Sequence, residues 1–107
     1  MPYRVLVIDD ETAIREAIRM AKSGLYDKVW MNRSYSTTTG TRTAPRRLPD
    51  VIGRRKTGEY DAIEVPSKSN SPLELYIRNR EALDQLPRAQ RGRIRIKTIL
   101  KSQKNDQ

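Results

Sequence analysis

The stretch PDVIGRRKTGEYDAIEVPSK, residues 49–68, predicts a β-hairpin and decides the fold of the chain. Its two strands are expected at about 48–54 and 59–66, because both segments are rich in apolar and β-branched residues. The loop between them is KTG, residues 56–58. A glycine at the last position of a three-residue loop is typical of a type I turn followed by a bulge, which fixes the register of the strands.

In this register the numbers of opposed residues add up to 114, so Asp50 is expected to lie opposite Glu64. Directly opposed side chains of an antiparallel pair have Cβ atoms about 5 Å apart, and opposed like charges destabilise the pair. The hairpin therefore predicts a cation between these two carboxylates.

The part of the chain before the hairpin predicts one helix and one strand. Residues 3–8 (YRVLVI) form an apolar run that fits either a strand or the start of a helix. A helix is expected from about 10 to 23, a β-prone segment lies in 26–35, and 36–47 reads as a polar loop. The face of the helix expected to be buried comprises Ile14, Ala17, Ile18 and Ala21.

The part of the chain after the hairpin predicts a second helix and a last strand. Ser71 is a suitable N-cap and Pro87 a suitable end for a helix over 71–87, and alternating isoleucines predict a strand at 92–100. The expected apolar stripe of this helix comprises Leu73, Tyr76, Ile77, Leu83 and Leu86, and its expected solvated face carries Asn79 and Gln85.

These elements predict one α/β domain over residues 1–107, with a best-supported core at about 10–100 and a frayed tail at 101–107. Their order, αβββαβ, indicates a sandwich in which helices flank a mixed sheet. The last strand follows a helical crossover and is therefore expected to run parallel to its neighbour.

Composition limits the chemistry. The chain carries 22 Lys and Arg against 13 Asp and Glu, a formal charge of +9, which favours a polyanionic partner and nucleic acid first. Because it has no cysteine and no histidine, thiol nucleophiles, Ser-His-Asp triads and His-ligated metal sites are excluded. No apolar run reaches the roughly 20 residues of a membrane-spanning helix, and the N-terminus is unlike a signal peptide, so we expect a soluble protein with an intracellular site of action.

Two facing carboxylates with a lysine, Lys68, just beyond them are suited to phosphodiester cleavage without histidine. Mg²⁺ is bound by one or two carboxylates together with water and substrate phosphate. Such an ion lowers the pKa of a bound water, and a lysine can stabilise the developing oxyanion. The sequence therefore predicts a divalent cation, Mg²⁺ first and Mn²⁺ or Zn²⁺ as alternatives, at Asp50 and Glu64.

The order αβββαβ, with Pro49-Asp50 on the second strand and an acid followed by a lysine on the third, resembles the PD-(D/E)XK nuclease superfamily. The string RRLPDVIGRRKTGEYDAIEVPSK and the helix after it are similar to nuclease domains of bacterial contact-dependent and polymorphic toxins. The likeness covers roughly residues 44–98, and the N-terminal helix by topology alone. It implies a restriction-endonuclease-like fold in which Asp50 and Glu64 bind metal and Lys68 acts in catalysis.

The resemblance further implies a glutamate from the N-terminal helix in the site, and Glu11 is preferred to Glu16 because it lies nearer the expected apolar face. The lysine departs from the superfamily pattern. Glu64 and Lys68 are four residues apart instead of two, about 13 Å in a regular strand, with Pro66 between them. Pro66 can mark a bulge that shortens this distance, or Ser67 can occupy the site instead.

Residues expected to contact nucleic acid are mostly arginines, since their combined charge is best explained by a phosphate backbone. They are Arg46, Arg47, Arg54, Arg55, Arg78 and Arg80, together with Tyr35, which could stack on a base. The substrate is DNA or RNA, tRNA included. The alternative from the same charge is a basic nucleic-acid-binding module without catalysis, which would not depend on Asp50.

A second resemblance competes with the nuclease. VLVIDDETAIREAI, residues 5–18, is similar to the start of a response-regulator receiver domain, in which acids after the first strand bind Mg²⁺ beside a phosphoacceptor aspartate. The basic, proline-broken RRLPD and the lack of further βα units in 60–107 do not fit that family.

The likeness to toxins has implications of its own. It implies that the chain is the cargo end of a larger secreted protein that acts in the cytoplasm of a recipient cell. It also implies an acidic immunity protein that covers the basic cleft.

Overall fold

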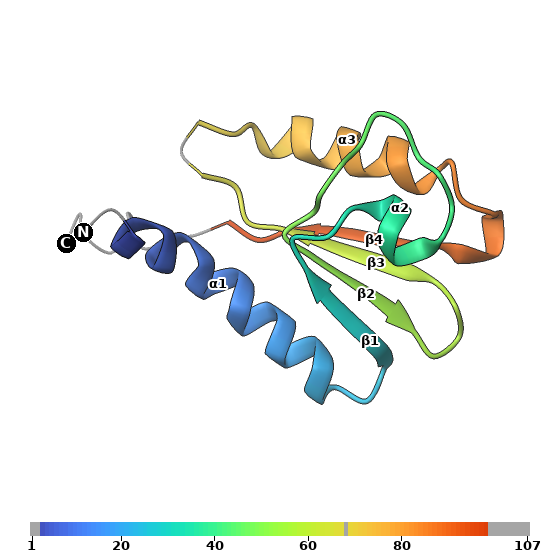
Figure 1. Ribbon diagram of the computed structural model, residues 1–107, viewed down its shortest axis with the longest axis horizontal. Helices are drawn as coiled ribbons and strands as arrows, with labels where there is room; N and C mark the ends of the chain where they lie inside the picture. The colour runs from blue at the N-terminus through green and yellow to red at the C-terminus, as the bar shows by residue number, and fades with distance from the viewer. Residues whose placement is uncertain (1–2, 68, 99–107) are drawn as a thin grey trace.

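A computed structural model describes the backbone of residues 3–67 and 69–98, and the side chains of the same ranges from residue 11 onward. It shows a four-stranded sheet with helices on both faces (Figure 1), in agreement with the predicted α/β class and mixed sheet. The tail expected to fray, 101–107, lies outside the described residues. In chain order the elements are α1 (Tyr3–Lys22), β1 (Tyr26–Met31), α2 (Tyr35–Thr39), β2 (Val51–Arg55), β3 (Tyr60–Glu64), α3 (Pro72–Leu83), the 3₁₀ turn η1 (Arg88–Gln90) and β4 (Arg91–Ile96).

The hairpin has the predicted register. β2 and β3 are antiparallel and pair Val51 with Ile63 and Gly53 with Asp61, as the three-residue loop requires. Gly58 closes that loop with φ of 105° and donates its N–H to the carbonyl of Arg55 at 2.8 Å. A positive φ is readily adopted by glycine, so the loop chemistry sets the pairing.

The sheet has the order β1-β2-β3-β4. β1 runs antiparallel to β2, and β4 runs parallel to β3, which confirms the direction predicted for the last strand. α3 supplies the crossover between β3 and β4, the connection that a parallel pair needs. None of the helices in the described part of the chain is long and apolar enough to cross a membrane.

Side chains of β2 and β3 alternate between two separate cores. Val51 and Ile63 pack with α1, whereas their neighbours Ile52 and Ala62 pack with α2 and α3. α1 therefore covers one face of the sheet, and α2 and α3 cover the other (Figure 1). Side chains on different faces of the sheet cannot contact one another, even at the same end of the strands. A site can therefore combine only residues that point to the same face.

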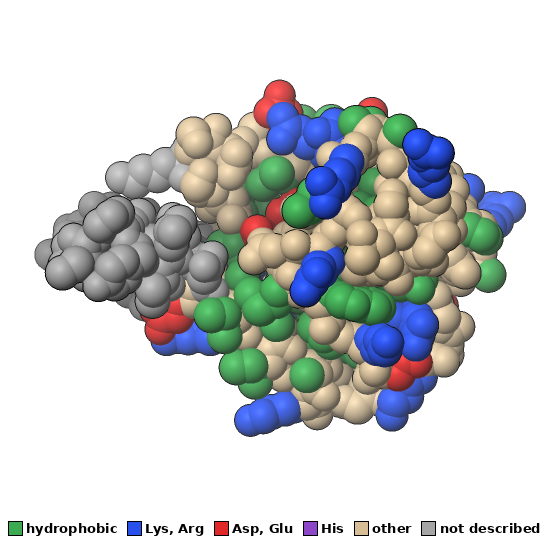
Figure 2. Space-filling model, in the orientation of Figure 1, with side chains coloured by type: hydrophobic (Ala, Val, Ile, Leu, Met, Phe, Trp, Pro, Cys, Tyr) green, Lys and Arg blue, Asp and Glu red, His purple; other side chains and the backbone are tan. Residues whose placement is uncertain are grey.

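The buried face of α1 differs from the prediction. Ile14 and Ile18 are 44% and 48% exposed, while Glu16, Ala13 and Met20 are buried. Figure 2 shows hydrophobic side chains at the surface over this helix. In this orientation Glu16 pairs with Arg95 of β4 and with Lys97 just beyond that strand, and Ala13 and Ala17 pack in the core beneath the helix.

The buried face of α3 also differs. Of the predicted stripe, Leu83 and Leu86 are buried, but Leu73, Tyr76 and Ile77 are 68%, 41% and 45% exposed. Ser71 caps the start of the helix as predicted, and its hydroxyl oxygen accepts the N–H of Glu74 at 3.3 Å. The helix ends at Leu83 rather than at Pro87, with Asp84 as its C-cap.

Two further expectations are decided by the structure. Residues 3–8 belong to α1, so the apolar run is the start of a helix and not the first strand that a receiver domain needs. The polar loop expected at 36–47 contains most of α2, which Ser34 caps and Gly40 ends in the left-handed conformation. The antiparallel pairing of β1, β2 and β3 is a second departure from a receiver, whose βα repeat gives parallel strands.

Candidate active site

The structure brings Asp50 and Glu64 together just beyond the last paired residues of the hairpin. The backbone N–H of Asp50 donates to Oε1 of Glu64 at 3.3 Å, and the N–H of Val65 donates to Oδ2 of Asp50 at 2.7 Å. Each carboxylate is thus oriented by the backbone of the other strand. Val65 packs with the α1 core, so the neighbouring Glu64 points to the other face, toward α3.

Glu64 is held from the α3 side by a buried polar network. Nδ2 of Asn79 donates to Oε2 of Glu64 at 2.8 Å and to the carbonyl of Leu75 at 2.8 Å. The hydroxyl of Tyr35 donates to Oδ1 of Asn79, and both of these side chains are buried. Every polar atom of the Asn79 side chain therefore has a partner, which fixes the direction in which Glu64 points.

Asn79 and Tyr35 correct two expectations. Asn79 was expected on the solvated face of its helix, and Tyr35 on the surface as a stacking partner for a base. Spacing could have placed Asn79, since it precedes the buried Leu83 by four residues and Leu86 by seven. Tyr35 has 0% of its surface exposed, so it supports the site through its hydrogen bond to Asn79 and cannot stack on nucleic acid.

Burial raises the pKa of Glu64 to about 7, and the neighbouring charge of Asp50 adds to this rise. The hydrogen bond from Asn79 acts in the opposite direction but does not cancel the effect. Burial likewise raises the pKa of Tyr35, which stays a neutral hydrogen-bond donor. Near neutral pH, Glu64 exchanges a proton beside Asp50, and a cation would compete with that proton for the same position.

The donor set fits a hard divalent cation that keeps part of its water shell. Mg²⁺ is commonly bound through one or two carboxylates plus water and phosphate oxygens. Hydrogen bonds from Asn79 and from the N–H of Val65 supply the outer support that ligating carboxylates usually have. Among the side chains of residues 11–67 and 69–98, no third acidic group joins Asp50 and Glu64 to form a larger cluster.

The acid expected from the N-terminal helix does not complete the pair. Glu11 is exposed and forms an ion pair with Arg15 at 2.6 Å, so the expectation that it lies nearer the apolar face than Glu16 is wrong. Glu16 is 1% exposed but contacts Arg95 and Lys97 on the α1 face, opposite the side to which Glu64 points.

The loop after β3 carries the other two predicted catalytic residues. Lys68 lies outside the described residues, so its predicted role stays a prediction. Ser67 is exposed, and its hydroxyl donates to Oδ1 of Asn70 at 2.9 Å. The same Oδ1 accepts the N–H of Ser67 at 3.1 Å, which makes a local turn of the loop. The serine hydroxyl is thereby directed into its own loop.

Most of the arginines expected to contact nucleic acid pair with carboxylates. On the face of the molecule that Figure 2 shows, lysine and arginine side chains are spread out rather than gathered in one patch. The pairs that Arg54, Arg78 and Arg80 form with exposed carboxylates contribute little to stability, so these three arginines can still turn toward a polyanion. Arg55 is instead held by the buried carboxylate of Asp61. The pairs are Arg54 with Asp27 at 2.9 Å, Arg55 with Asp61 at 2.7 Å, Arg78 with Glu74 at 4.0 Å and Arg80 with Asp84 at 3.2 Å, while Arg46 is exposed and Arg47 half-buried.

Replacement of Tyr35 by phenylalanine tests the network beneath the site. Tyr35→Phe leaves Oδ1 of Asn79 buried without its donor, so we expect a loss of about 1–3 kcal/mol in the free energy of unfolding, measured by urea denaturation. Thr37→Ala, at an exposed position of α2, is the control for general effects on that helix. A loss no larger than that of the control would contradict the buried hydrogen bond.

Comparison of the chain with known protein families, with curated proteins and with solved structures finds no match. The geometry of the sheet and of the carboxylate pair therefore carries the functional inference.

Proposed function

We propose that the protein is a metal-dependent nuclease that cleaves phosphodiester bonds in DNA or RNA. The observation that carries the proposal is the pairing of Asp50 and Glu64 at the end of the hairpin, each oriented by hydrogen bonds. A formal charge of +9 favours a polyanionic substrate. The ion is Mg²⁺ in the first instance, with Mn²⁺ or Zn²⁺ as alternatives.

Asp50 and Glu64 would hold the ion, which when bound supplies an activated water and offsets the charge that develops on the phosphate. Asn79 keeps one oxygen of Glu64 fixed, which preserves the geometry of the pair through turnover. Lys68, four residues beyond Glu64, is proposed to stabilise the charge that develops on phosphate oxygens.

The resemblance to PD-(D/E)XK nucleases supports the proposal through the order of elements and the positions of Asp50 and Glu64. Among the side chains described from residue 11 onward, no acid of the N-terminal helix joins the pair, so this part of the pattern is not met there. A role as a toxin domain with an acidic immunity protein is part of the proposal and rests on the resemblance alone.

Cleavage of plasmid, single-stranded DNA and total tRNA, measured with Mg²⁺, Mn²⁺ or Zn²⁺ and with chelator, tests the proposal. We expect cleavage that requires metal and falls at least 100-fold in Asp50→Asn, since loss of a ligating carboxylate removes several kcal/mol of charge stabilisation. Asp27→Asn is the matched control, because it removes an exposed carboxylate from β1.

Two results would contradict the nuclease. Metal-dependent cleavage that is equal in Asp50→Asn and Asp27→Asn would remove the pair from catalysis. Salt-sensitive binding of nucleic acid without cleavage under any metal would favour the non-catalytic binding module.

A further inference from the structure

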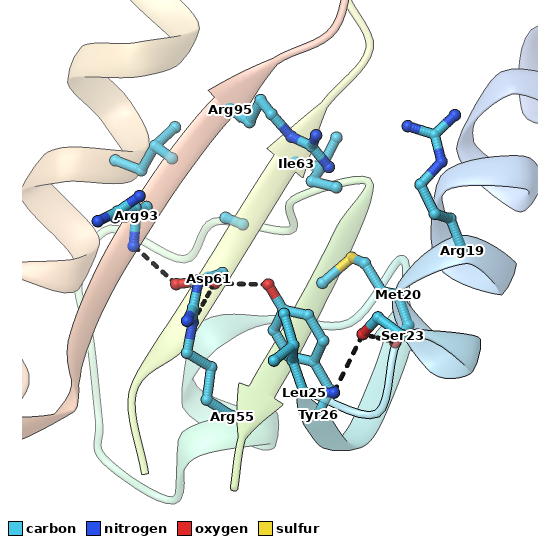
Figure 3. A pocket seen from close by; sticks show the side chains of 12 residues that line it. Arg19, Met20, Ser23, Leu25, Tyr26, Arg55, Asp61, Ile63, Arg93 and Arg95 are labelled. Carbon is cyan, nitrogen blue, oxygen red and sulfur yellow. Dashed lines mark hydrogen bonds and ion pairs between the residues drawn. The ribbon is translucent and has the colours of Figure 1, made fainter. Parts of the chain in front are cut away.

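A second feature lies on the opposite face of the sheet, between α1 and the edge strand β4. α1 packs on β1, β2 and β3, so it leaves the same face of β4 uncovered. The result is a groove of about 370 Å³. Figure 3 shows Arg19 on the α1 side of this groove, Arg93 and Arg95 on β4, and Asp61 between them on β3. None of these residues belongs to the carboxylate pair.

The two carboxylates beside the groove, Asp61 and Glu16, are buried and already have hydrogen-bond or ion-pair partners. Asp61 accepts the hydroxyl of Tyr26 at 2.6 Å, Nε of Arg55 at 2.7 Å and the N–H of Arg93 at 2.8 Å. Burial, and after it the hydrogen bond to Asp61, raises the pKa of Tyr26 to about 12, so its hydroxyl remains a donor. The negative charge of Asp61 therefore serves the interior of the protein and not the solvent.

Glu16 is the second buried carboxylate, and three cations surround it. Arg95 lies at 3.3 Å, Arg19 at 3.5 Å and Lys97 at 3.6 Å from its oxygens. The side chains of Arg19 and Arg95 are nonetheless 61% and 55% exposed, so their remaining N–H groups face solvent. With Arg55 and Arg93, five cations face two carboxylates, and the groove presents a net positive surface.

Of the five cations, Arg93 is the one that does not neutralise a buried carboxylate. It is exposed, and within the described ranges its guanidinium makes no hydrogen bond or ion pair. An arginine that neutralised a buried acid would be paired, as Arg55 and Arg95 are. Arg93 is thus available for a ligand with oxygen acceptors.

We propose that this groove binds the phosphate backbone of a single-stranded segment of nucleic acid. Arg93 and Arg95 of β4, and Lys97 just beyond its end, lie on one face at intervals of about 6.6 Å, so they present a row of cations rather than a point. A row suits successive phosphates of a polymer better than one small anion. Leu25, which is 54% exposed, lines the same groove and offers an apolar contact to unpaired bases or sugars.

The size of the groove favours an unpaired strand. Its volume is near the lower end of ligand-binding pockets and accommodates a nucleotide, whereas a duplex would have to lie across the rim. At its far end the row reaches the backbone of β3, since the N–H of Lys97 donates to the carbonyl of Glu64 at 2.8 Å. The Glu64 side chain points to the opposite face, so binding in the groove does not rest on the proposed function.

Binding of fluorescent single-stranded oligonucleotides, measured by anisotropy over a range of salt concentrations in chelator, tests the groove without cleavage. The test variant is Arg93→Ala combined with Arg95→Gln. The matched control is Arg42→Ala combined with Arg88→Ala, which removes the same charge at exposed positions outside the groove. We expect binding at least tenfold weaker and a salt slope reduced by about 1.4 in the test variant, or about 0.7 per lost phosphate contact.

Equal binding by the two double variants would overturn the proposal, as would tighter binding of duplex or equal competition by inorganic phosphate. Arg93→Ala alone, which removes no hydrogen bond or ion pair of the described side chains, is expected to lower the slope by about 0.7 with an unchanged melting temperature. If it binds as the wild type does, the groove is excluded even where the double variant fails to fold. Intact groove binding without metal-dependent cleavage would overturn the nuclease alone.

Discussion

Glu64→Gln is expected to unfold at a higher temperature than the wild-type protein at pH 8 and, at the same time, to lose at least 100-fold of metal-dependent cleavage. The stability gain arises because the ionised carboxylate is buried beside Asp50. Glutamine is neutral, and its carbonyl can still accept from Asn79. A residue that destabilises the fold in the ionised form that the proposed metal site needs is typical of a functional site.

The pH dependence of this gain follows from the direction of the pKa shift. Below about pH 4.5 Glu64 is protonated in both the folded and the unfolded chain, so the stability that the protonated side chain contributes is fully present. Between about 4.5 and 7 the unfolded chain has released the proton while the folded chain retains it, so wild-type stability falls as pH rises. The variant should therefore match the wild type at pH 4 and exceed it by about 1–3 kcal/mol at pH 8.

Thermal and urea unfolding of both proteins across this pH range measures the difference. Glu81→Gln, at an exposed position of α3, is the control and should show no such crossing. Added Mn²⁺ should raise the melting temperature of the wild type and leave Glu64→Gln unchanged, because only the folded wild type binds the ion. The stability difference between Glu64→Gln and the wild type should be larger at pH 8 than at pH 4. An equal difference at the two pH values would contradict burial of the ionised Glu64 beside Asp50.

Gly92→Ala is expected to destabilise the protein by about 3–5 kcal/mol, a large part of the total for a domain of this size. A Cβ at this position of β4 would lie 2.1 Å from the carbonyl oxygen of Tyr60 and 2.2 Å from Oδ1 of Asp61. The carbonyl belongs to the backbone of β3 and cannot turn aside. The strands would have to separate, which would break the contacts that compensate the buried charge of Asp61.

Gly24→Ala is the control, since a Cβ at that position meets no atom within 4 Å and Gly24 has φ of 81°. The strain of a left-handed residue costs about 1–2 kcal/mol. Urea denaturation should separate the two variants clearly. A cost for Gly92→Ala no greater than that for Gly24→Ala would show that β3 and β4 tolerate a wider spacing.

The hairpin could be predicted because its information is local. A glycine-ended loop fixes the register, and the register alone brings Asp50 to Glu64. The parallel direction of β4 followed from the helical crossover before it. In each case a short segment and one geometric rule were sufficient.

The orientation of the helices could not be predicted, because it depends on residues far away in sequence. Glu16 is buried by Arg95 and Lys97, which lie some eighty positions further along the chain, so counting apolar residues favoured the wrong face. The spacing of Leu83 and Leu86 places Asn79 on the buried face, but it does not reveal that Glu64 and Tyr35 are the partners of Asn79. Burial of polar groups is decided by partners, and one helix considered alone does not reveal them.

The loop between β2 and β3, residues 56–58, limits the insertions that this protein can tolerate. A strand displaced by one residue turns every side chain to the opposite face. One inserted residue within 56–58 would therefore expose Ile52 or Ala62 and point Asp50 and Glu64 away from each other, although nothing in that exposed bend touches either acid. We expect its length to be invariant among functional descendants, while the longer connection over 41–48 accepts insertions.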